Sequence, residues 1–195
     1  MKIGKPHILI CGPSASGKDT VANIILTNFN VKRARAFTTR PKRSGELDTE
    51  YHFISCEEAS QVPDDIKFCQ MKLNGYEYFF TETNFNHTDI AVIDPTGVMW
   101  CVENMKTTPF LVIECVARQS VRYKRYLRRD KNTTLVEFKK REDETMPEFA
   151  KLAEFMDTFR INVCPLKIDT SNYDPDELVP LIKKNVSDFF SAFDE

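Results

Sequence analysis

The sequence predicts an α/β fold: a parallel sheet core flanked by helices, with an inserted strand-rich subdomain and a helical lid. Apolar runs of strand length alternate with stretches of helical periodicity along most of the chain. A glycine-rich loop separates the first apolar run from the first helix, whereas the middle of the chain carries mainly strand patterns. We therefore expect a single domain of 195 residues, with a core at 1–35 and 89–195, the subdomain at about 36–88 and the lid at about 125–145.

Strands are predicted where four to eight residues are continuously apolar or alternate with polar ones. The run "PFLVIECV" at 109–116 is the clearest buried strand. In chain order, we expect strands at 7–11, 34–39, 51–55, 67–73, 76–81, 89–94, 109–116 and 165–169.

Helices are predicted where apolar residues recur three or four positions apart. In the last such segment this apolar stripe runs from Leu178 to Phe193 and is expected to pack in the core. Pro147 favours a break or a kink in the segment that contains it. We expect helices at 18–28, 120–128, 134–160 and 174–193.

The charge and the cysteine content narrow the possible function classes. A net charge of −2 gives no bulk attraction to a nucleic-acid polymer or an anionic membrane, so anions must be bound by locally placed basic groups. None of the six cysteines forms a Cys-x-x-Cys pair, and Cys11 and Cys115 lie in apolar runs, as buried thiols do in a reducing compartment. The sequence shows no signal peptide and no apolar stretch of membrane-spanning length, so we expect a cytoplasmic location.

The segment "GPSASGKDT" at 12–20 fits a phosphate cradle, because Gly12-x-x-x-x-Gly17-Lys18 follows a strand and opens a helix. The glycines let successive backbone N–H groups point inwards, the helix offers its positive end, and Lys18 reaches the outer phosphates. The alternative is a glycine turn that caps a helix and binds no ligand. We expect ATP to be bound by Gly12, Pro13, Ser14, Ala15, Ser16, Gly17, Lys18, Asp19 and Thr20.

The residue after Lys18 is unusual for such a cradle. Serine or threonine ordinarily stands there and holds Mg²⁺, whereas this chain has Asp19 and places Thr20 one position later. An acid in the first helical turn suits the helix macrodipole. Asp19 either faces away from the phosphates or helps to hold Mg²⁺ through water, so Asp19 and Thr20 are the candidate metal residues.

The segment "FTTRPKRSGELDTEYHF" at 37–53 is the second informative motif. A phosphate monoester carries nearly two negative charges, which Arg40 and Arg43 can clamp through bidentate, charge-assisted hydrogen bonds. Glu46 can orient an arginine, and the Tyr51 hydroxyl can add a neutral donor. The alternative is a solvated basic loop, which we disfavour because the same chain carries the cradle.

The two motifs together resemble the guanylate kinase family of nucleoside monophosphate kinases. The order of that family's basic segment is kept in Thr38-Thr39-Arg40, Arg43, Gly45-Glu46 and Tyr51-x-Phe53. Further along, "NGYEYFFT" at 74–81 and "VIDPTGV" at 92–98 resemble two other segments of the family. The resemblance implies that Tyr78, Thr81 and Asp94 join the site for the monophosphate.

The resemblance also implies a P-loop kinase fold and a reaction, the transfer of a phosphoryl group from MgATP to a nucleoside monophosphate. "RYLRR" at 125–129 is similar to the arginine-rich start of the family's lid, with Arg129 as the candidate and Arg141 one residue late for its partner. On this basis Lys18, Arg129 and Arg141 are the predicted catalytic residues. The alternative for each arginine of the lid is a solvated helix face.

Three departures from the family pattern leave the base of the acceptor open. Ala36 stands where the family has a guanine-reading serine, and its guanine-reading glutamate falls at Gln70 or Cys69. The helix expected before Asp94 is also short. We expect GMP or dGMP as acceptor, and the alternatives are a broader deoxynucleoside monophosphate kinase, a kinase of another phosphorylated small molecule, and a non-catalytic guanylate-kinase-like binding module.

Overall fold

The chain folds into two compact units. The computed structural model describes residues 4–43, 46, 48–73, 75–129, 134–158 and 162–193. Gly45 of the basic segment and residues 130–133 of the expected lid lie outside them. The larger unit comprises Met1–Asn30 and Val92–Glu195, and the smaller unit is Val31–Ala91. The sequence pattern placed the inserted part at about 36–88.

The larger unit is built on parallel strands. Strand β1 (His7–Cys11) pairs in parallel with β7 (Phe110–Val116), and β7 pairs in parallel with β8 (Val163–Asp169). The order of the sheet is β6-β1-β7-β8, and the edge strand β6 (Ile90–Val92) begins in the last two residues of the smaller unit. Every residue of β1 is buried, as expected for an inner strand of a parallel sheet with both faces covered. The predicted parallel core is thus confirmed.

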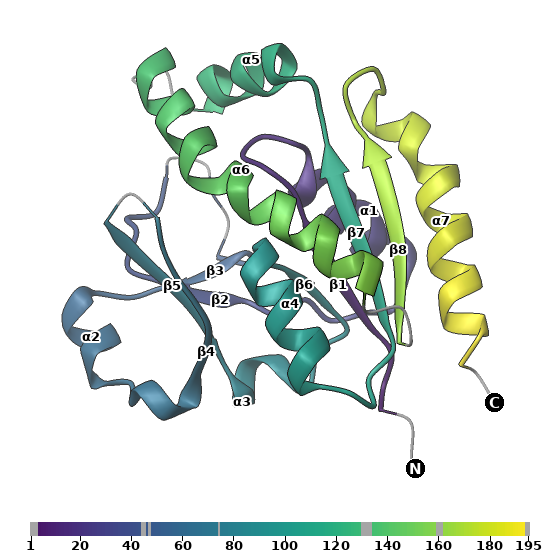
Figure 1. Ribbon diagram of the computed structural model, residues 1–195, viewed down its shortest axis with the longest axis horizontal. Coiled ribbons are helices and arrows are strands. Elements are labelled where there is room, and N and C mark those ends of the chain that lie inside the picture. The colour runs from purple at the N-terminus through teal and green to yellow at the C-terminus, as the bar shows by residue number, and fades with distance from the viewer. Residues whose placement is uncertain are drawn as a thin grey trace. The chain divides into compact units, whose positions relative to one another are not determined.

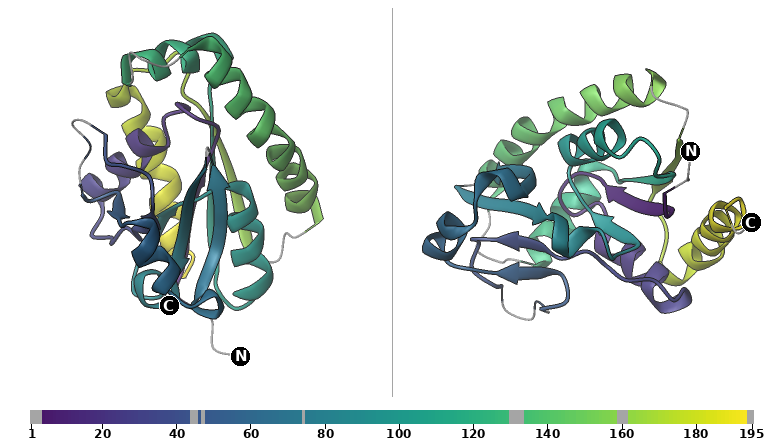
Figure 2. Two further views of the ribbon diagram at one scale, coloured as in Figure 1. Left: turned by 90° about the vertical axis from the view of Figure 1, so that its left-hand side faces the viewer. Right: turned by 90° about the horizontal axis from the view of Figure 1, so that it is seen from below.

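Two pairs of helices cover this sheet. Helix α1 (Lys18–Asn28) packs against α7 (Pro175–Ser191), and α4 (Pro95–Asn104) packs against α6 (Leu135–Thr158). Figures 1 and 2 show the first pair on one face of the sheet and the second pair on the other. Helix α5 (Gln119–Arg129) leads towards α6 and contacts it. None of the described helices has the length and apolar character needed to cross a membrane.

The smaller unit is a mixed sheet with an aromatic core. Its strands in chain order are β2 (Ala36–Thr38), β3 (Tyr51–Phe53), β4 (Lys67–Leu73) and β5 (Tyr76–Thr81). Their order in the sheet is β3-β2-β5-β4, with β2 parallel to β3 and β5 antiparallel to its two neighbours. Phe68, Phe80 and Phe85 pack on one another with centroids 5.2 to 6.0 Å apart.

Three features of the fold differ from the sequence predictions. Helices α2 (Cys56–Gln61) and α4 were not predicted, and the short helix expected before Asp94 is the four-residue α3 (Glu82–Phe85). Of the break or kink expected at Pro147, the break is absent, because α6 continues through this residue from Leu135 to Thr158. In α7 the stripe is narrower than expected, since Leu181 is 44% exposed and lies outside the buried face. That buried face consists of Leu178, Ile182, Val186 and Phe189, while Phe193 is also exposed.

Candidate functional site

The predicted phosphate cradle between β1 and α1 contains three residues with positive φ angles. Gly12, Ala15 and Gly17 have φ angles of +150°, +60° and +92°. A Cβ atom at Gly12 would lie 2.2 Å from the carbonyl oxygen of Cys115, so a larger residue does not fit there. The left-handed conformation of Ala15 is strained for a residue with a side chain, and such strain gathers at loops that bind ligands.

Lys18 folds back over this loop. Its Nζ donates hydrogen bonds to the carbonyl oxygens of Gly12 at 2.8 Å and Pro13 at 3.0 Å. Burial lowers the pKa of Lys18, the nearby Asp19 carboxylate works against that shift, and the charge of Arg129 adds to it. The loop therefore holds a partly buried ammonium group, and a charge with reduced solvation attracts an anion more strongly than one in open water.

Asp19 and Thr20 lie in the first turn of α1, directly after Lys18. Both side chains carry oxygen atoms, the type of ligand that Mg²⁺ prefers. The negative charge of Asp19 also suits the positive end of the helix. The structure thus puts the two predicted metal residues beside the cradle.

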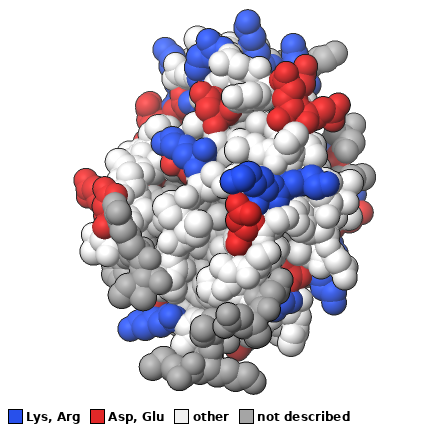
Figure 3. Space-filling view, turned by 90° about the vertical axis from the view of Figure 1, so that its right-hand side faces the viewer, with Lys and Arg blue, Asp and Glu red and all other residues white. Residues whose placement is uncertain are grey.

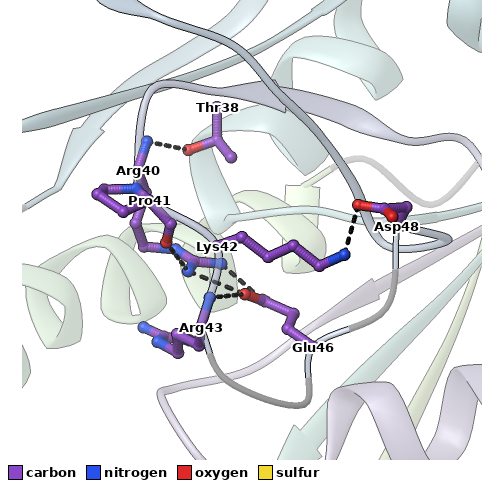
Figure 4. Close-up of polar contacts among 7 residues, drawn as sticks. All are labelled: Thr38, Arg40, Pro41, Lys42, Arg43, Glu46 and Asp48. Atoms are coloured by element: carbon purple, nitrogen blue, oxygen red, sulfur yellow. Dashed lines mark hydrogen bonds and ion pairs between the residues drawn. The ribbon is translucent and has the colours of Figure 1, made fainter.

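In the smaller unit, Glu46 joins the two predicted clamp arginines. Its Oε1 and Oε2 accept hydrogen bonds from Nη2 and Nη1 of Arg40 at 2.6 and 3.0 Å, and Oε2 also accepts from the backbone N–H of Arg43 at 3.0 Å. Figure 4 shows the guanidinium of Arg43 pointing away from this carboxylate. The arginine-orienting role predicted for Glu46 therefore has a structural basis at Arg40.

The electrostatics of this pair stabilise both charges. Burial works against the charge of Arg40, but the hydrogen bond to Glu46 and the contact with Tyr78 outweigh it and raise the pKa of Arg40. Burial likewise works against the charge of Glu46, but the hydrogen bonds from Arg40 and the Arg43 backbone lower the pKa of Glu46. Both groups are consequently ionised at neutral pH.

Aromatic side chains surround the Arg40 guanidinium. Its Cζ lies 5.5 Å from the ring centroids of both Tyr51 and Phe53. Tyr78 meets Tyr51 edge to face at 6.0 Å. The backbone N–H of Arg40 donates to the buried hydroxyl of Thr38 at 3.1 Å, which fixes the start of the loop. The structure thus gathers the predicted residues Arg40, Glu46, Tyr51 and Tyr78 in one place.

The two positions expected to read the base have no carboxylate. Strand β4 has a register shift between Phe68 and Met71, so Cys69 and Gln70 form a β-bulge. Cys69 has a φ of +49°, and Gln70 is exposed. Ala36 is 7% exposed and offers only a methyl group.

Two other predicted acceptor residues cap helices. Thr81 caps α3 in a capping box, where its N–H donates to Oδ1 of Asn84 at 2.8 Å. Asp94 caps α4, and its Oδ1 accepts from the N–H of Gly97 at 2.8 Å. Burial raises the pKa of Asp94, and hydrogen bonds from the backbone of Gly97 and Thr96 work against that rise. Each cap gives its residue a structural role that stands beside the predicted binding role.

The two predicted lid arginines lie in different surroundings. Arg129, the last residue of α5, is exposed, and its Cζ lies 5.6 Å from the ring centroid of Tyr126. Arg141 is 6% exposed and donates from Nη1 to the Tyr126 hydroxyl at 3.0 Å. In this structure Arg141 thus packs between α5 and α6, and its role at the transferred group stays a prediction.

One face of the molecule carries charged side chains of both signs. Among the described residues on the face shown in Figure 3, basic side chains are interspersed with acidic ones. The candidate anion-binding groups lie in each unit separately: the predicted cradle with Lys18 in the larger unit, and the Arg40–Glu46–Arg43 clamp in the smaller unit.

Known proteins resemble this chain along most of its length. The sequence model of guanylate kinase matches residues 4–155. The chain belongs to the guanylate kinase family. The guanylate kinase of Mesomycoplasma hyopneumoniae strain 7448 is 30% identical over 109 residues, which are 51% of this chain and 55% of that protein. The guanylate kinase of Nitratidesulfovibrio vulgaris strain Hildenborough is 36% identical over 59 residues, 29% of this chain and 28% of that protein.

The chain thus spans about half, or less, of the length of the curated guanylate kinases that it matches. A crystal structure of guanylate kinase from Anaplasma phagocytophilum superimposes with a TM-score of 0.60 at 17% identity, covering 96% of this chain and 87% of that one. This likeness shows the fold, and it confirms the P-loop kinase architecture expected from the sequence.

In this guanylate kinase family member, the sequence did not predict the contacts that two residues make beside the cradle. Thr170 follows β8 and contacts both the cradle and Arg125 of α5. The sequence offers no signal for Thr170, since a threonine after a strand is ordinary. Arg125 belongs to the predicted lid segment "RYLRR". The helical periodicity there does not show which arginine is solvated and which is hydrogen-bonded to the protein.

Proposed function

We propose that this protein transfers the γ-phosphoryl group of ATP to a nucleoside monophosphate, with GMP or dGMP as the favoured acceptor. The observation that carries the proposal is the Arg40–Glu46–Arg43 clamp, which occurs in a chain that also has the complete cradle of Gly12 to Lys18. A solvated basic loop would not bury an arginine to 6% exposure against a bidentate carboxylate and two aromatic rings.

The clamp offers chemical groups that suit the phosphate of an acceptor. The guanidinium of Arg40 is held in place, so it loses little entropy when it binds. Arg43, Tyr51 and Tyr78 add a second guanidinium and two hydroxyl groups to the same region. Such a set provides the planar and charge-assisted bonds that a phosphate monoester requires.

The reaction would need no nucleophilic side chain. An oxygen of the acceptor phosphate attacks the γ-phosphorus, the bond to the β–γ bridging oxygen breaks, and ADP leaves with the electron pair of that bond. The cradle and Lys18 hold the donor phosphates, and Arg129 and Arg141 stabilise the negative charge on the moving group. Catalysis then comes from positioning and electrostatics.

Mg²⁺ fits the residues at the cradle. Asp19 and Thr20 supply a carboxylate and a hydroxyl next to Lys18, and they are the residues that would hold the ion. Among the described residues there is no group of three or more His, Cys, Asp or Glu side chains placed to hold a metal. When bound, Mg²⁺ neutralises charge on the donor phosphates.

The test is a panel of nucleoside monophosphates assayed with ATP, on the wild type and on Arg40→Ala. We expect the variant to raise the KM of the acceptor about tenfold or more, while the KM of ATP changes less than about twofold. Lys42→Ala is the matched control, because Lys42 lies in the same loop but pairs with Asp48 at the surface. Equal loss of affinity for both substrates would refute the clamp.

A broader deoxynucleoside monophosphate kinase is the second candidate. The methyl group of Ala36 and the exposed amide of Gln70 favour it, since neither provides the hydroxyl or the carboxylate expected to read guanine. The same panel distinguishes this candidate from a GMP or dGMP kinase, because similar turnover of monophosphates with several different bases supports the broader kinase. A strong preference for a pyrimidine, or for a phosphorylated molecule that is not a nucleotide, would reject guanine as the favoured base.

Calorimetry of ATP binding distinguishes the proposed kinase from a non-catalytic binding module. The cradle keeps Gly17 and Lys18, so we expect ATP to bind with measurable heat. No heat and no turnover together would support the binding module. The proposal includes a cytoplasmic site of action, for which the six free cysteines are the supporting observation.

A further inference from the structure

Thr170 joins three segments of the larger unit. It follows β8 and is 3% exposed. Its hydroxyl donates to the carbonyl oxygen of Ser16 in the cradle at 2.8 Å and accepts from Nη1 of Arg125 in α5 at 2.8 Å. Nη2 of Arg125 also donates to the Thr170 carbonyl oxygen at 2.7 Å. A hydroxyl has one proton and two lone pairs, so both bonds can exist together.

The position of the Thr170 side chain is fixed from the sheet. Its backbone N–H donates to the carbonyl oxygen of Val116, the last residue of β7, at 2.8 Å. The side chain also packs against the end of the cradle, because a Cβ atom at Gly17 would lie 3.2 Å from its Oγ1. The hydroxyl therefore stands on a rigid support directly beside the loop.

Ser16 and Gly17 share one planar peptide group. In a trans peptide the C=O and the N–H point in opposite directions. When Thr170 holds the Ser16 carbonyl, it also makes the Gly17 N–H point in the opposite direction within that plane, away from Thr170. Inward N–H groups are what a phosphate cradle uses to bind its ligand, so this one hydrogen bond influences the binding group itself.

We propose that Thr170 is a positioning residue for the nucleoside triphosphate: its hydroxyl sets the orientation of the Ser16–Gly17 peptide and, through Arg125, ties the cradle to helix α5. This inference rests on the proposed function. Thr170 acts through Ser16 and Arg125 and does not itself contact the substrate. Arg125 accordingly links helix α5 to Thr170, which in turn contacts the cradle.

The first test compares Thr170→Val with Thr170→Ser. Valine keeps the shape and removes the hydroxyl, whereas serine keeps the hydroxyl. We expect Thr170→Val to weaken ATP binding about tenfold by calorimetry and to raise the KM of ATP similarly, with the KM of the acceptor within about twofold of the wild type. Thr170→Ser should bind ATP like the wild type. If Thr170→Val does not fold, Thr170→Ala takes its place.

The second test is a double-mutant cycle with Arg125→Met. If Thr170 and Arg125 act in one network, the double variant should lose less ATP affinity than the product of the two single losses. Additive losses would overturn the link to α5. Wild-type ATP affinity in Thr170→Val, or equal loss for ATP and acceptor, would overturn the positioning role.

These failures differ from failure of the proposed function. A wild-type protein that turns over no monophosphate with ATP would reject the kinase. A wild type that turns over GMP, together with a Thr170→Val variant of unchanged ATP affinity, would reject the positioning role alone.

Discussion

Glu46 binds both nitrogen ends of the Arg40 guanidinium and, through the same carboxylate, the backbone N–H of Arg43. One acid therefore sets the side chain of the first arginine and the backbone of the second. The side chains of Arg40 and Glu46 are 7% and 10% exposed, so water competes little for these bonds. This relationship makes Glu46 the residue on which the clamp geometry depends.

We predict that Glu46→Gln weakens the acceptor site and leaves the donor site intact. The neutral amide cannot accept two charge-assisted bonds, so Arg40 should lose its fixed position. We expect the KM of the acceptor to rise about tenfold and stability to fall by about 2 kcal/mol. Steady-state kinetics and urea unfolding measure these changes. Asp48→Asn, at an acid exposed to 73%, is the control and should change neither quantity.

The stability contribution of Glu46 should depend on pH in a defined direction. Its pKa is lowered in the folded protein, so the folded state holds the proton less tightly than the unfolded chain does. The contribution is therefore complete above the unfolded value of 4.5 and is lost as pH falls through the lowered folded value. In urea unfolding, the difference in unfolding free energy between the wild type and Glu46→Gln should be larger at about pH 6 than at about pH 3. A difference that stays constant would contradict this assignment.

Lys18→Met should abolish activity without lowering stability. The pKa of Lys18 is lowered by burial, which means that its charge opposes folding at neutral pH. Methionine keeps most of the unbranched length of the side chain and removes that charge. We expect turnover to fall by about 10³-fold, while the melting temperature at pH 7 equals or exceeds that of the wild type.

The same variant offers a pH test. As pH rises towards the ordinary lysine value of 10.5, the folded protein loses the proton before the unfolded chain does, so the penalty disappears. The stability of the wild type relative to Lys18→Met should therefore increase at alkaline pH. A clearly lower melting temperature for Lys18→Met at pH 7 would show that the hydrogen bonds to Gly12 and Pro13 outweigh the burial penalty.

Asp94 permits a separation of its helix-capping role from its predicted binding role. The Asp94→Asn variant would still cap α4, because asparagine is as good a cap as aspartate, whereas Asp94→Ala removes both cap and charge. We expect Asp94→Ala to cost about 1 kcal/mol of stability and Asp94→Asn to cost little. If Asp94 binds the acceptor or the water shell of the metal, both variants should lose activity. Full activity in Asp94→Asn would leave the cap as its sole role.

The sequence predicted the core of the fold because the strands of a parallel sheet are continuous apolar runs. The segment at 7–11 became β1 with every residue buried, and the helix at 18–28 became α1 with the same bounds. The start of α4 was missed, although Asp94 and Pro95 form an ordinary start signal, because these residues directly follow a strand pattern. Helix α3 has only four residues, too few for periodicity to show.

The candidate site was predictable where its chemistry lies close together in sequence. Arg40, Arg43 and Glu46 follow one another three positions apart, so one motif contains the whole clamp. The contact of Thr170 with Ser16 spans 154 positions, and no local pattern encodes such a contact. The neighbourhood of Gln70 depends on a β-bulge, which alternation of polar and apolar residues does not reveal.

The distribution of the six thiols gives this chain a built-in pair of labelling positions. Cys11, Cys101 and Cys115 are buried, and burial raises the pKa of Cys11 and Cys115, so they stay unreactive towards alkylating dyes. Cys56 and Cys164 are exposed, the former in the smaller unit and the latter in the larger. With Cys69 replaced by serine, a donor and an acceptor fluorophore on these two native cysteines would report by energy transfer how the separation of the units responds to each nucleotide.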